Sequence, residues 1–413
     1  MKIVFVNPVG VMGGAERVLL TALAALKATK PSIQLYLIVC TSGSLVEQAQ
    51  QLGVQVIVLP LPKQVNQLGD SAFKSKNPVI ARLSLLVRVG ILLPVLQQYL
   101  KEFRQAIQAI NPDLIHSNGI KTHLLAALAS LKSIPIIWHI HDFYSTRPLM
   151  AWILRWISDR ATAGIAISDA VAQDIRATLP RLPISTIYNA VDVNYFSPEQ
   201  DVADVSKQIP DLRHSFDTNT LVNHTIRVGL VATFARWKGH DIFLDAADQL
   251  LHHQPDLNVH FYIIGSPIYK TKGSQFSQQE SQDKAAALQI ADKVEFIDFQ
   301  FNIAEVYRNL DIVVHTSTQP EPFGLAIVEA MACGKPVIVS QAGGAAELFT
   351  DNYDAIGIPP GDRTALASAI QQLIESPQLR QRLSKNARVT VLKRFSSDRL
   401  GEQILGVYEK FTS

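Results

Sequence analysis

Short apolar runs alternate with longer segments of helical periodicity along most of the chain. KIVFVN (2–7) and QLYLIV (34–39) have the composition of strands, and GGAERVLLTALAALKA (13–28) between them has the period of a helix. The alternation continues through four further apolar runs: VQVIVLP (54–60), PDLIHSN (112–118), PIIWHIHD (135–142) and AGIAIS (163–168). Strands that alternate with helices predict a parallel sheet covered on both faces, and hence an α/β fold.

The same alternation starts again after a polar segment without periodicity, residues 199–224. The apolar runs of the second half are IRVGLVATF (226–234), VHFYIIG (259–265), VEFIDF (294–299), DIVVHTS (311–317) and PVIVSQ (336–341). A chain of 413 residues is also too long for one compact core. We therefore predict two Rossmann-like βαβ domains, 1–190 and 191–397, that face each other across a cleft. A C-terminal helix at about 398–413 is expected to pack back on the first domain.

Composition excludes several classes of protein. The net charge of +2 argues against a nucleic-acid binder that acts by bulk charge. Two cysteines provide no disulfide framework, which favours a reducing, cytoplasmic location. No signal peptide is expected, because Gly13 and Gly14 follow the first apolar run so closely. The most apolar stretch, Val79 to Leu100, is interrupted by Arg82, Arg88 and Pro94, so no membrane-spanning helix is predicted.

Polar or glycine-rich segments follow several predicted strands, where open α/β sheets bind their ligands. They are GVMGGAER with Gly14, WHIHDF with His139, His141 and Asp142, TFARWKGHD with Arg236 and Lys238, and EPFGLAIVEAMACGKP with Glu321 and Glu329. Each has a simpler explanation: a tight turn, a core histidine, a solvated basic loop, or a buried Glu paired with a structural Arg. For His139 the core role is preferred, and for His141, at the end of its strand, a functional role is preferred.

The segment EPFGLAIVEAMACGKP (321–336) carries the sharpest signal. Glu329 lies among apolar residues, and a buried carboxylate without a partner costs several kcal/mol. A helix that begins near Phe323 would direct the N–H groups of Phe323, Gly324 and Leu325 toward an anion. Carboxylates on either side of a helix N-terminus suit a ligand with hydroxyls at both ends and negative charge in the middle. A nucleotide-sugar has this layout.

With these residues in view, the chain resembles the retaining glycosyltransferases of family 4, the glycogen-synthase-like glycosyl transferases of group 1, which have the GT-B fold. The spacing from Glu321 to Glu329 is the strongest element of the resemblance. Five further segments match in order over the whole chain: MGGAERVLL (12–20), HIHD (139–142), AISDAV (166–171), YNAVDVNYF (188–196) and GGAAE (343–347).

The resemblance implies a role for each matched residue. Glu321 should contact hydroxyls of the donor sugar, and Glu329 should bind the ribose. Lys238 should neutralise the leaving diphosphate, His141 should lie beside the reacting sugar, and Gly14 should let the first loop approach the donor. It also implies that the first domain binds the acceptor and the second the nucleotide-sugar.

One position departs from the family pattern. Family members usually carry an arginine five residues before the lysine, where this chain has Thr233, so Arg236 is the candidate replacement. No Asp-x-Asp sequence occurs, which fits a metal-free site in which cations and a helix terminus stabilise the leaving charge. The expected reaction is retaining, metal-independent transfer of a hexosyl group from a UDP-sugar to a hydroxyl acceptor, without a cofactor. An epimerase and a nucleotide-sugar-binding protein without transfer activity are the alternatives.

Two apolar, basic segments bear on the acceptor. Residues Val79–Ile110 contain four cations and one acid, and Arg147–Arg160 places Trp152 and Trp156 on one helical face. Tryptophan beside arginine suits a membrane interface, so a lipid-linked or envelope-polysaccharide acceptor is expected, with peripheral contact to the inner face of a membrane. Two alternatives remain: both helices belong to the core, or the arginines bind a soluble sugar phosphate, as in sucrose-phosphate synthesis.

Overall fold

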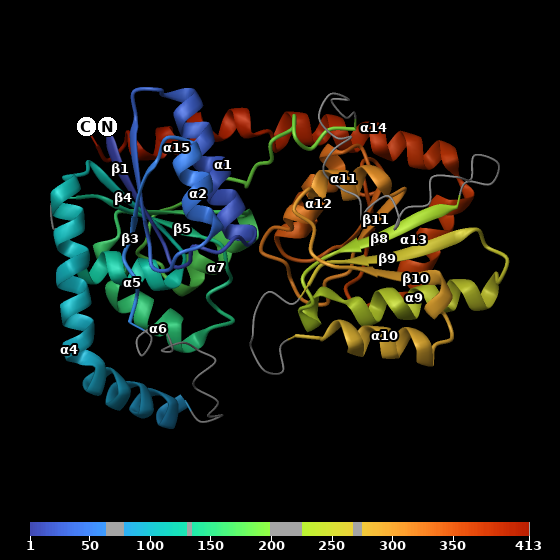
Figure 1. Cartoon of the computed structure of the whole chain (residues 1–413), viewed down its shortest axis with the longest axis horizontal. Coiled ribbons are helices and arrows are strands. Elements are labelled where there is room, and N and C mark those ends of the chain that lie inside the picture. The colour runs from blue at the N-terminus through green and yellow to red at the C-terminus, as the bar shows by residue number, and fades with distance from the viewer. Residues whose placement is uncertain (63–77, 130–133, 199–224, 267–274, 413) are drawn as a thin grey trace. The chain divides into compact units, whose positions relative to one another are not determined.

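The computed structural model describes residues 1–62, 78–129, 134–198, 225–266 and 275–412, without the side chains of 78–89 and 91. It divides into two compact units, which we call the N-terminal unit (Met1–Ala190 with Ser397–Ser413) and the C-terminal unit (Val191–Ser396). Each unit is built on its own sheet, and helices flank that sheet (Figure 1). The polar segment 199–224 lies outside the described residues.

The N-terminal unit contains a seven-stranded sheet of order β3-β2-β1-β4-β5-β6-β7, in which all neighbouring pairs are parallel. Its strands are β1 (Lys2–Asn7), β2 (Gln34–Val39), β3 (Gln55–Val58), β4 (Leu114–Asn118), β5 (Ile136–Ile140), β6 (Ala163–Ala166) and β7 (Ile184–Thr186). Four residues of β1, Ile3 to Val6, are completely buried, as expected of a central strand that is covered on both faces.

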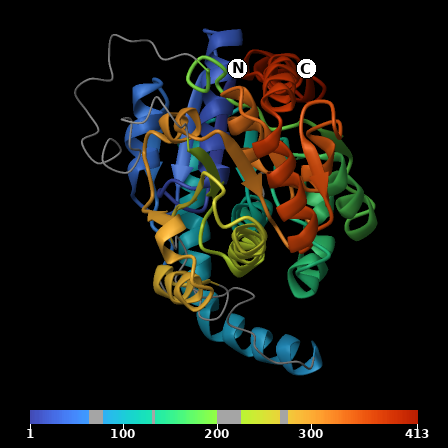
Figure 2. The ribbon, with the colours of Figure 1, turned by 90° about the vertical axis from the view of Figure 1, so that its right-hand side faces the viewer.

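The helices of this unit follow its strands along the chain. They are α1 (Gly14–Thr29), α2 (Ser44–Gln51), α4 (Pro78–Ile110), α5 (Ile120–Ala129), α6 (Pro148–Ile157), α7 (Asp169–Thr178), the 3₁₀ turns η2 (Ser158–Arg160) and η6 (Ser397–Arg399), and α15 (Leu400–Tyr408). The N-terminal part of α4 extends beyond the other elements of its unit in Figures 1 and 2. Among the described residues, no helix is both long enough and apolar enough to cross a membrane.

The last helix, α15, packs directly against α1. The approach is close at Gly401, where an added Cβ would lie 2.1 Å from Thr29 Oγ1 and 2.5 Å from the Ala25 carbonyl oxygen. Further along the helix, Ile404 and Tyr408 are completely buried. Residues from the end of the chain therefore complete the core of the N-terminal unit.

The C-terminal unit contains a six-stranded parallel sheet of order β10-β9-β8-β11-β12-β13. Its strands are β8 (Ile226–Val231), β9 (Val259–Ile264), β10 (Val294–Ile297), β11 (Ile312–His315), β12 (Val337–Ser340) and β13 (Ile356–Ile358). The order reverses direction between β8 and β11, and the loops at the carboxyl ends of these two strands therefore flank the point at which such sheets bind ligands.

Helices cover this sheet in two layers. They are α9 (His240–His253), α10 (Gln278–Ala287), α11 (Ile303–Asn309), α12 (Leu325–Ala332), α13 (Arg363–Glu375) and α14 (Pro377–Arg394), with the 3₁₀ turns η3 (Arg236–Lys238), η4 (Ala291–Lys293) and η5 (Gly344–Glu347). Helix α9 contacts α10 and α13, whereas α12 contacts α11 and α14, and Figure 1 shows α9 and α12 on opposite sides of the sheet.

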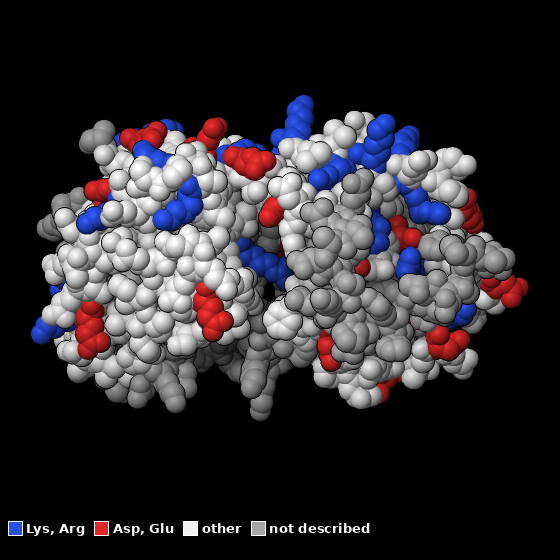
Figure 3. Space-filling model, turned by 45° about the horizontal axis from the view of Figure 1, so that its top comes forward, with Lys and Arg blue, Asp and Glu red and all other residues white. Residues whose placement is uncertain are grey.

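Helix α14 carries six cationic residues and no acidic one. Lys and Arg side chains gather on this side of the C-terminal unit in Figure 3. Several of these arginines have structural partners: Arg388 donates to the carbonyl oxygens of Phe196, Ala332 and Val193, and Arg394 donates to that of Glu347. Part of the basic character of α14 therefore serves to hold loops of its own unit.

Candidate active site

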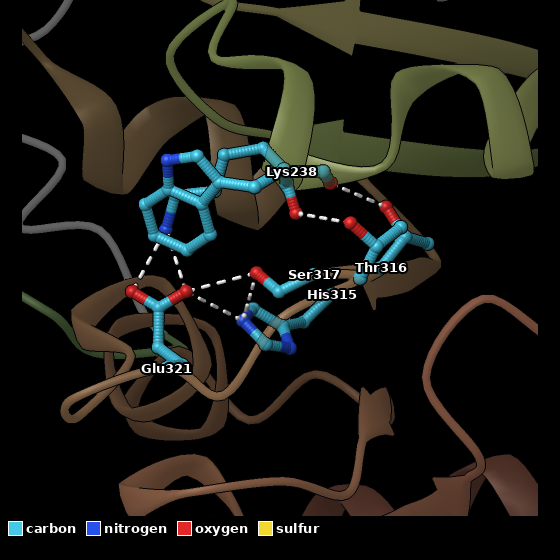
Figure 4. Close-up of polar contacts among 7 residues, drawn as sticks. Lys238, His315, Thr316, Ser317 and Glu321 are labelled. Atoms are coloured by element: carbon cyan, nitrogen blue, oxygen red, sulfur yellow. Dashed lines mark hydrogen bonds and ion pairs between the residues drawn. The ribbon is translucent and has the colours of Figure 1, made fainter. Parts of the chain in front are cut away.

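A lysine and a glutamate meet at the carboxyl edge of the C-terminal sheet. Lys238 lies in the turn η3 after β8, and Glu321 lies in the loop between β11 and α12. The Lys238 Nζ is 2.8 Å from Oε1 and 2.7 Å from Oε2 of Glu321, so both carboxylate oxygens accept from it (Figure 4). Both side chains are largely buried, with 19% and 10% of their surface exposed.

Two residues from the end of β11 complete the surroundings of the carboxylate. Ser317 Oγ donates to Glu321 Oε2 at 2.8 Å, and His315 Nε2 lies 3.3 Å from the same oxygen (Figure 4). Burial by itself would raise the pKa of Glu321, but the charge of Lys238 and the hydrogen bond from His315 hold it well below its usual range. Glu321 is therefore an anion whenever Lys238 and His315 are in place.

The backbone at Glu321 is fixed by the GGAAE segment. The Gly344 N–H donates to the Glu321 carbonyl oxygen at 2.7 Å, and Glu321 forms a parallel bridge with Gly343. Gly343 has a positive φ of 64°, and a Cβ there would lie 2.5 Å from the Glu321 carbonyl oxygen. Only glycine suits this position, because both the conformation and the close approach exclude a side chain.

The turn that carries Lys238 is hydrogen-bonded to the segment that follows β11. Thr316 Oγ1 donates to the Lys238 carbonyl oxygen at 2.8 Å, and the Lys238 ammonium lies 4.1 Å from the centre of the Trp237 ring. Sequence analysis did not identify His315, Thr316 or Ser317. The signal was available in the run DIVVHTS, whose last three residues are polar and follow directly after buried strand residues.

The segment between the two glutamates differs slightly from expectation. Helix α12 begins at Leu325, two residues later than predicted, because Gly324 adopts a left-handed conformation with φ of 102° before it. The Phe323 side chain is buried and packs edge-to-face on Phe395, so it belongs to the core, and only its backbone is a candidate for ligand binding.

Glu329 is buried in α12, with 4% of its surface exposed, and its Oε2 accepts a hydrogen bond from the Tyr307 hydroxyl at 3.0 Å. The protein itself thus supplies part of the polar surroundings that this carboxylate requires. Tyr307 comes from α11, which precedes β11 in the chain, and sequence reasoning gave no indication of it.

Arg236 has different partners from Lys238. Its guanidinium pairs with Glu280 at 2.9 Å and lies 4.2 Å from the centre of the Phe276 ring. The side chains of Arg236 and Glu280 are both about half exposed. The structure therefore brings Lys238 and Glu321 together and places Arg236 in another pair.

The two remaining predicted site residues belong to the N-terminal unit. Gly14 is exposed at the first position of α1, and His141 directly follows β5, where its Nε2 contacts Asn118 Oδ1 at 2.5 Å. Burial lowers the pKa of His141 to about 4. His139, for which a core role was preferred, is buried within the sheet and contacts His116 at 3.1 Å. Asp142 pairs with Arg147 at 3.3 Å.

Two Rossmann-like units with parallel sheets, one carrying a lysine–carboxylate pair at its carboxyl edge, define a protein of the GT-B fold class. Residues 12–195 match the family model described as Glycosyltransferase Family 4, and residues 215–390 match that of Glycosyl transferases group 1. The chain belongs to this family of glycosyltransferases.

Solved and curated relatives agree with this assignment. The crystal structure of Anabaena HepE in complex with UDP-glucose is 26% identical, covers 99% of this chain and 100% of that one, and superposes with a TM-score of 0.77. Mannosylfructose-phosphate synthase of Agrobacterium fabrum is 26% identical over 56% of this chain and 48% of its own length. The lipopolysaccharide core mannosyltransferase LpsB of Rhizobium meliloti is 27% identical over 55% of this chain and 61% of its own length. The matches to these two curated relatives thus span about half to three fifths of their length.

Proposed function

We propose that this protein is a retaining, metal-independent glycosyltransferase that transfers a hexosyl group from a UDP-sugar to a hydroxyl acceptor. The observation that carries the proposal is the Glu321 carboxylate, which Lys238, His315 and Ser317 hold as an anion at the carboxyl edge of the sheet. The presence of UDP-glucose in the similar protein HepE supports the choice of donor.

The Lys238–Glu321 pair suits a nucleotide-sugar site in its unliganded state. Each group neutralises the other, which avoids the large cost of an isolated buried charge. When a nucleotide-sugar binds, its diphosphate offers Lys238 a new anion, and the sugar hydroxyls offer Glu321 new hydrogen-bond donors. The two charges would therefore be shared with the ligand, without exposing either of them unpaired.

The other candidate residues take roles around this pair. The backbone N–H groups at Phe323, Gly324 and Leu325 bind the diphosphate at the start of α12, and Glu329 binds the ribose hydroxyls. Arg236 contributes a second cation once it leaves Glu280. In the N-terminal unit, His141 lies beside the reacting sugar, and Gly14 lets the first loop approach the donor.

The chemistry follows from where charge develops. As the anomeric bond to the diphosphate breaks, negative charge grows on the leaving group, and Lys238 with the α12 N–H groups stabilises it. The acceptor hydroxyl attacks from the same face of the sugar, and the leaving phosphate takes the acceptor proton. The configuration at the anomeric carbon is retained.

The direct test measures UDP release from a panel of UDP-sugars, with and without candidate acceptors. We expect release that depends on an acceptor, and Glu321→Gln should reduce it on the order of 10²-fold while the fold is kept. EDTA should leave the rate unchanged. Release without any acceptor would favour the epimerase alternative, binding without release would favour a binding protein, and strict dependence on Mg²⁺ or Mn²⁺ would contradict the metal-free mechanism.

The acceptor is proposed to be a lipid-linked or envelope-polysaccharide precursor at the inner face of a membrane. Trp152 and Trp156 of α6 support this choice, because 39% and 74% of their surfaces are exposed and their rings contact each other edge-to-face. Arg155 is exposed between them. The side chains of Arg82 and Arg88 lie outside the described residues. Of the other two cations of α4, Lys101 is exposed and Arg104 donates to the Ala129 carbonyl oxygen at 3.0 Å.

A soluble sugar phosphate is the second candidate acceptor, and the similarity to mannosylfructose-phosphate synthase favours it. The arginines near α6 are less available for a phosphate than the sequence suggests. Arg147 pairs with Asp142, and Arg160 donates to the Ala127 carbonyl oxygen at 3.0 Å.

Flotation with anionic liposomes distinguishes the two acceptors. Wild-type protein should float with the vesicles at low salt, and the double variant Trp152→Ala/Trp156→Ala should not. Vesicles of neutral phosphatidylcholine are the control for the charge contribution. If the wild type stays entirely in the soluble fraction, the membrane proposal fails and the sugar-phosphate acceptor takes its place.

A further inference from the structure

A buried chain of hydrogen bonds leads to His141 through the N-terminal unit. The His141 ring contacts Asn118 Oδ1 through Nε2 at 2.5 Å, and Asn118 Nδ2 donates to Asn7 Oδ1 at 2.6 Å. Asn7 Nδ2 in turn donates to the Val9 carbonyl oxygen at 2.6 Å and to Glu16 Oε1 at 3.2 Å. The two asparagines end the neighbouring strands β4 and β1, and Glu16 lies in the first turn of α1.

The middle of this hydrogen-bond network is buried, so the hydrogen bonds of Asn7, Asn118 and Glu16 must be made mainly within the protein. Asn7 is completely buried, Asn118 is 2% exposed and Glu16 is 7% exposed. A buried amide that faces the wrong partner would set two acceptors or two donors against each other, which costs the desolvation energy of both groups.

The hydrogen bond from Asn7 to the Val9 carbonyl oxygen, at one end of the network, fixes the direction of the other hydrogen bonds that lead to His141. The Val9 carbonyl oxygen can only accept a hydrogen bond, so the Asn7 group that faces it must be the NH₂. Asn7 Oδ1 then faces Asn118 and requires its NH₂, which leaves Asn118 Oδ1 toward His141. An acceptor at that place requires a proton on His141 Nε2. Protonation of Glu16 would not reverse this order, because the Val9 carbonyl remains.

Burial keeps the His141 ring neutral, since it lowers the pKa of this residue to about 4. A neutral imidazole that carries its proton on Nε2 has a lone pair on Nδ1. The Nδ1 atom can then accept a hydrogen bond from a hydroxyl but cannot donate one.

The neighbouring histidines belong to separate networks. His139 Nδ1 contacts His116 Nε2 at 3.1 Å, and the Tyr408 hydroxyl contacts His116 Nδ1 at 2.6 Å. Ser117, adjacent to Asn118 on β4, contacts His123 at 2.7 Å. None of these hydrogen bonds involves His141, Asn118, Asn7 or Glu16, although the His139 and His141 rings pack on each other with centres 4.4 Å apart. The hydrogen bonds that lead to His141 can therefore be altered without removing those of the other histidines.

We propose that Asn118 is a positioning residue that holds His141 in the Nε2–H tautomer, and that Asn7, anchored on Val9 and Glu16, fixes the orientation of Asn118. The functional importance of this arrangement rests on the proposed role of His141 at the donor sugar. In that role, His141 Nδ1 accepts a hydrogen bond from a sugar hydroxyl. The anchors Val9 and Glu16 lie on either side of residues 10–15, a segment that includes Gly14 at the first position of α1.

The experiment reads the tautomer directly in the full-length protein. Histidine is labelled with ¹⁵N, and long-range proton–nitrogen correlation spectra at pH 7.5 distinguish Nε2–H from Nδ1–H rings. The His141 signal is assigned by its loss in His141→Gln. We expect the Nε2–H pattern in the wild type and a mixture of tautomers in Asn118→Leu. Asn7→Ala should also give a mixture, although Asn7 does not touch His141.

Ser117→Ala is the matched control, because it removes a buried hydrogen bond from the same strand but at a different histidine. Ser117→Ala should leave the His141 spectrum unchanged and the turnover number within about twofold of wild type. Asn118→Leu, in contrast, should lower the turnover number about 10²-fold. Glu16→Gln should preserve the tautomer, because the Val9 anchor remains.

An Nδ1–H pattern at His141 in the wild type would overturn the proposal, even if the variants do not fold. An unchanged tautomer in both Asn118→Leu and Asn7→Ala would overturn it as well. The spectra require no donor or acceptor. If no sugar transfer is found, the proposed function fails, while the tautomer result still decides whether Asn118 positions His141.

Discussion

At the scale of single residues, the site depends on the mutual neutralisation of Lys238 and Glu321. A buried ion pair is a poor source of stability in itself, but removal of one partner leaves the other as an uncompensated charge. Because His315 and Ser317 also direct their hydrogen bonds to Glu321, the carboxylate is arranged to stay charged. The lysine should therefore matter for stability as well as for the reaction.

Lys238→Met should reduce the free energy of unfolding by about 3 kcal/mol at pH 7.5, because Glu321 then remains buried without its cation. The loss should be smaller at low pH, since the pKa of Glu321 rises when Lys238 is absent and the group becomes neutral more easily. The measurement is urea unfolding. The double variant Lys238→Met/Glu321→Gln should recover most of the loss, and equal stability of the single and double variants would contradict the argument.

The sequence could predict part of this site. A carboxylate such as Glu329 within an apolar helix must have a partner, and Lys238 and Glu321 follow strands whose carboxyl ends meet at one sheet edge. The sequence could not identify His315 and Ser317 as partners of Glu321, because these contacts depend on the direction of the side chains at the end of β11. Tyr307 was also hidden, since its contact with Glu329 joins two helices separated by a strand.

At the scale of helices and strands, periodicity predicted most elements, because parallel strands that are covered on both faces appear as continuous apolar runs. The start of α12 was misplaced by two residues because the left-handed Gly324 delays the helix, and a glycine's backbone conformation cannot be read from sequence. A C-terminal helix that packs back on the first domain was expected, but its close approach to α1 at Gly401 was not visible, because the contacting residues are more than 370 positions apart.

Two glycines of α15 provide a matched pair of substitutions. Gly401→Ala should reduce the free energy of unfolding by about 1–3 kcal/mol, because its Cβ would lie 2.1 Å from Thr29 Oγ1 and 2.5 Å from the Ala25 carbonyl oxygen. Gly406→Ala should raise it by up to about 1 kcal/mol, since no atom lies within 4 Å of its Cβ and alanine favours the helix. Urea unfolding measures both, and the same sign for both variants would contradict close packing at Gly401.

At the scale of the whole molecule, buried histidines are a common feature of both units. Burial lowers the pKa of His116 to about 3 and those of His141 and His240 to about 4, and it holds the pKa values of His123 and His139 well below their usual range. Most of these groups lie in or beside the sheet of the N-terminal unit. Their neutral state is part of what the folded chain requires.

These histidines should make stability fall in mild acid. In the unfolded chain a histidine takes up a proton near pH 6.5, whereas His116, His141 and His240 in the folded protein do so only near pH 4 or below. Between those values the unfolded state binds more protons, so the free energy of unfolding rises with pH in this window and is unaffected by these groups above it. At pH 5, each of these three histidines should lower the free energy of unfolding by about 2 kcal/mol relative to its value at pH 7.5. The pKa of Glu321 is lowered in the folded protein, so protonation of this group in the unfolded chain lowers the free energy of unfolding further only below about pH 4.3.

Urea unfolding at pH 7.5, 6.0 and 5.0 tests this expectation, with tryptophan fluorescence as the probe, since three of the four tryptophans belong to the N-terminal unit. The midpoint should decrease from pH 6.5 downward. In Ser117→Ala/His123→Phe, one titrating ring is replaced by another aromatic ring that can stack on Trp138, where His123 now lies with ring centres 4.9 Å apart. Because burial holds the pKa of His123 well below its usual range, this variant should lose less free energy of unfolding than wild type between pH 7.5 and pH 5. A midpoint that stays constant over this range would show that these histidines take up protons as readily in the folded protein as in the unfolded chain, and would contradict the expectation.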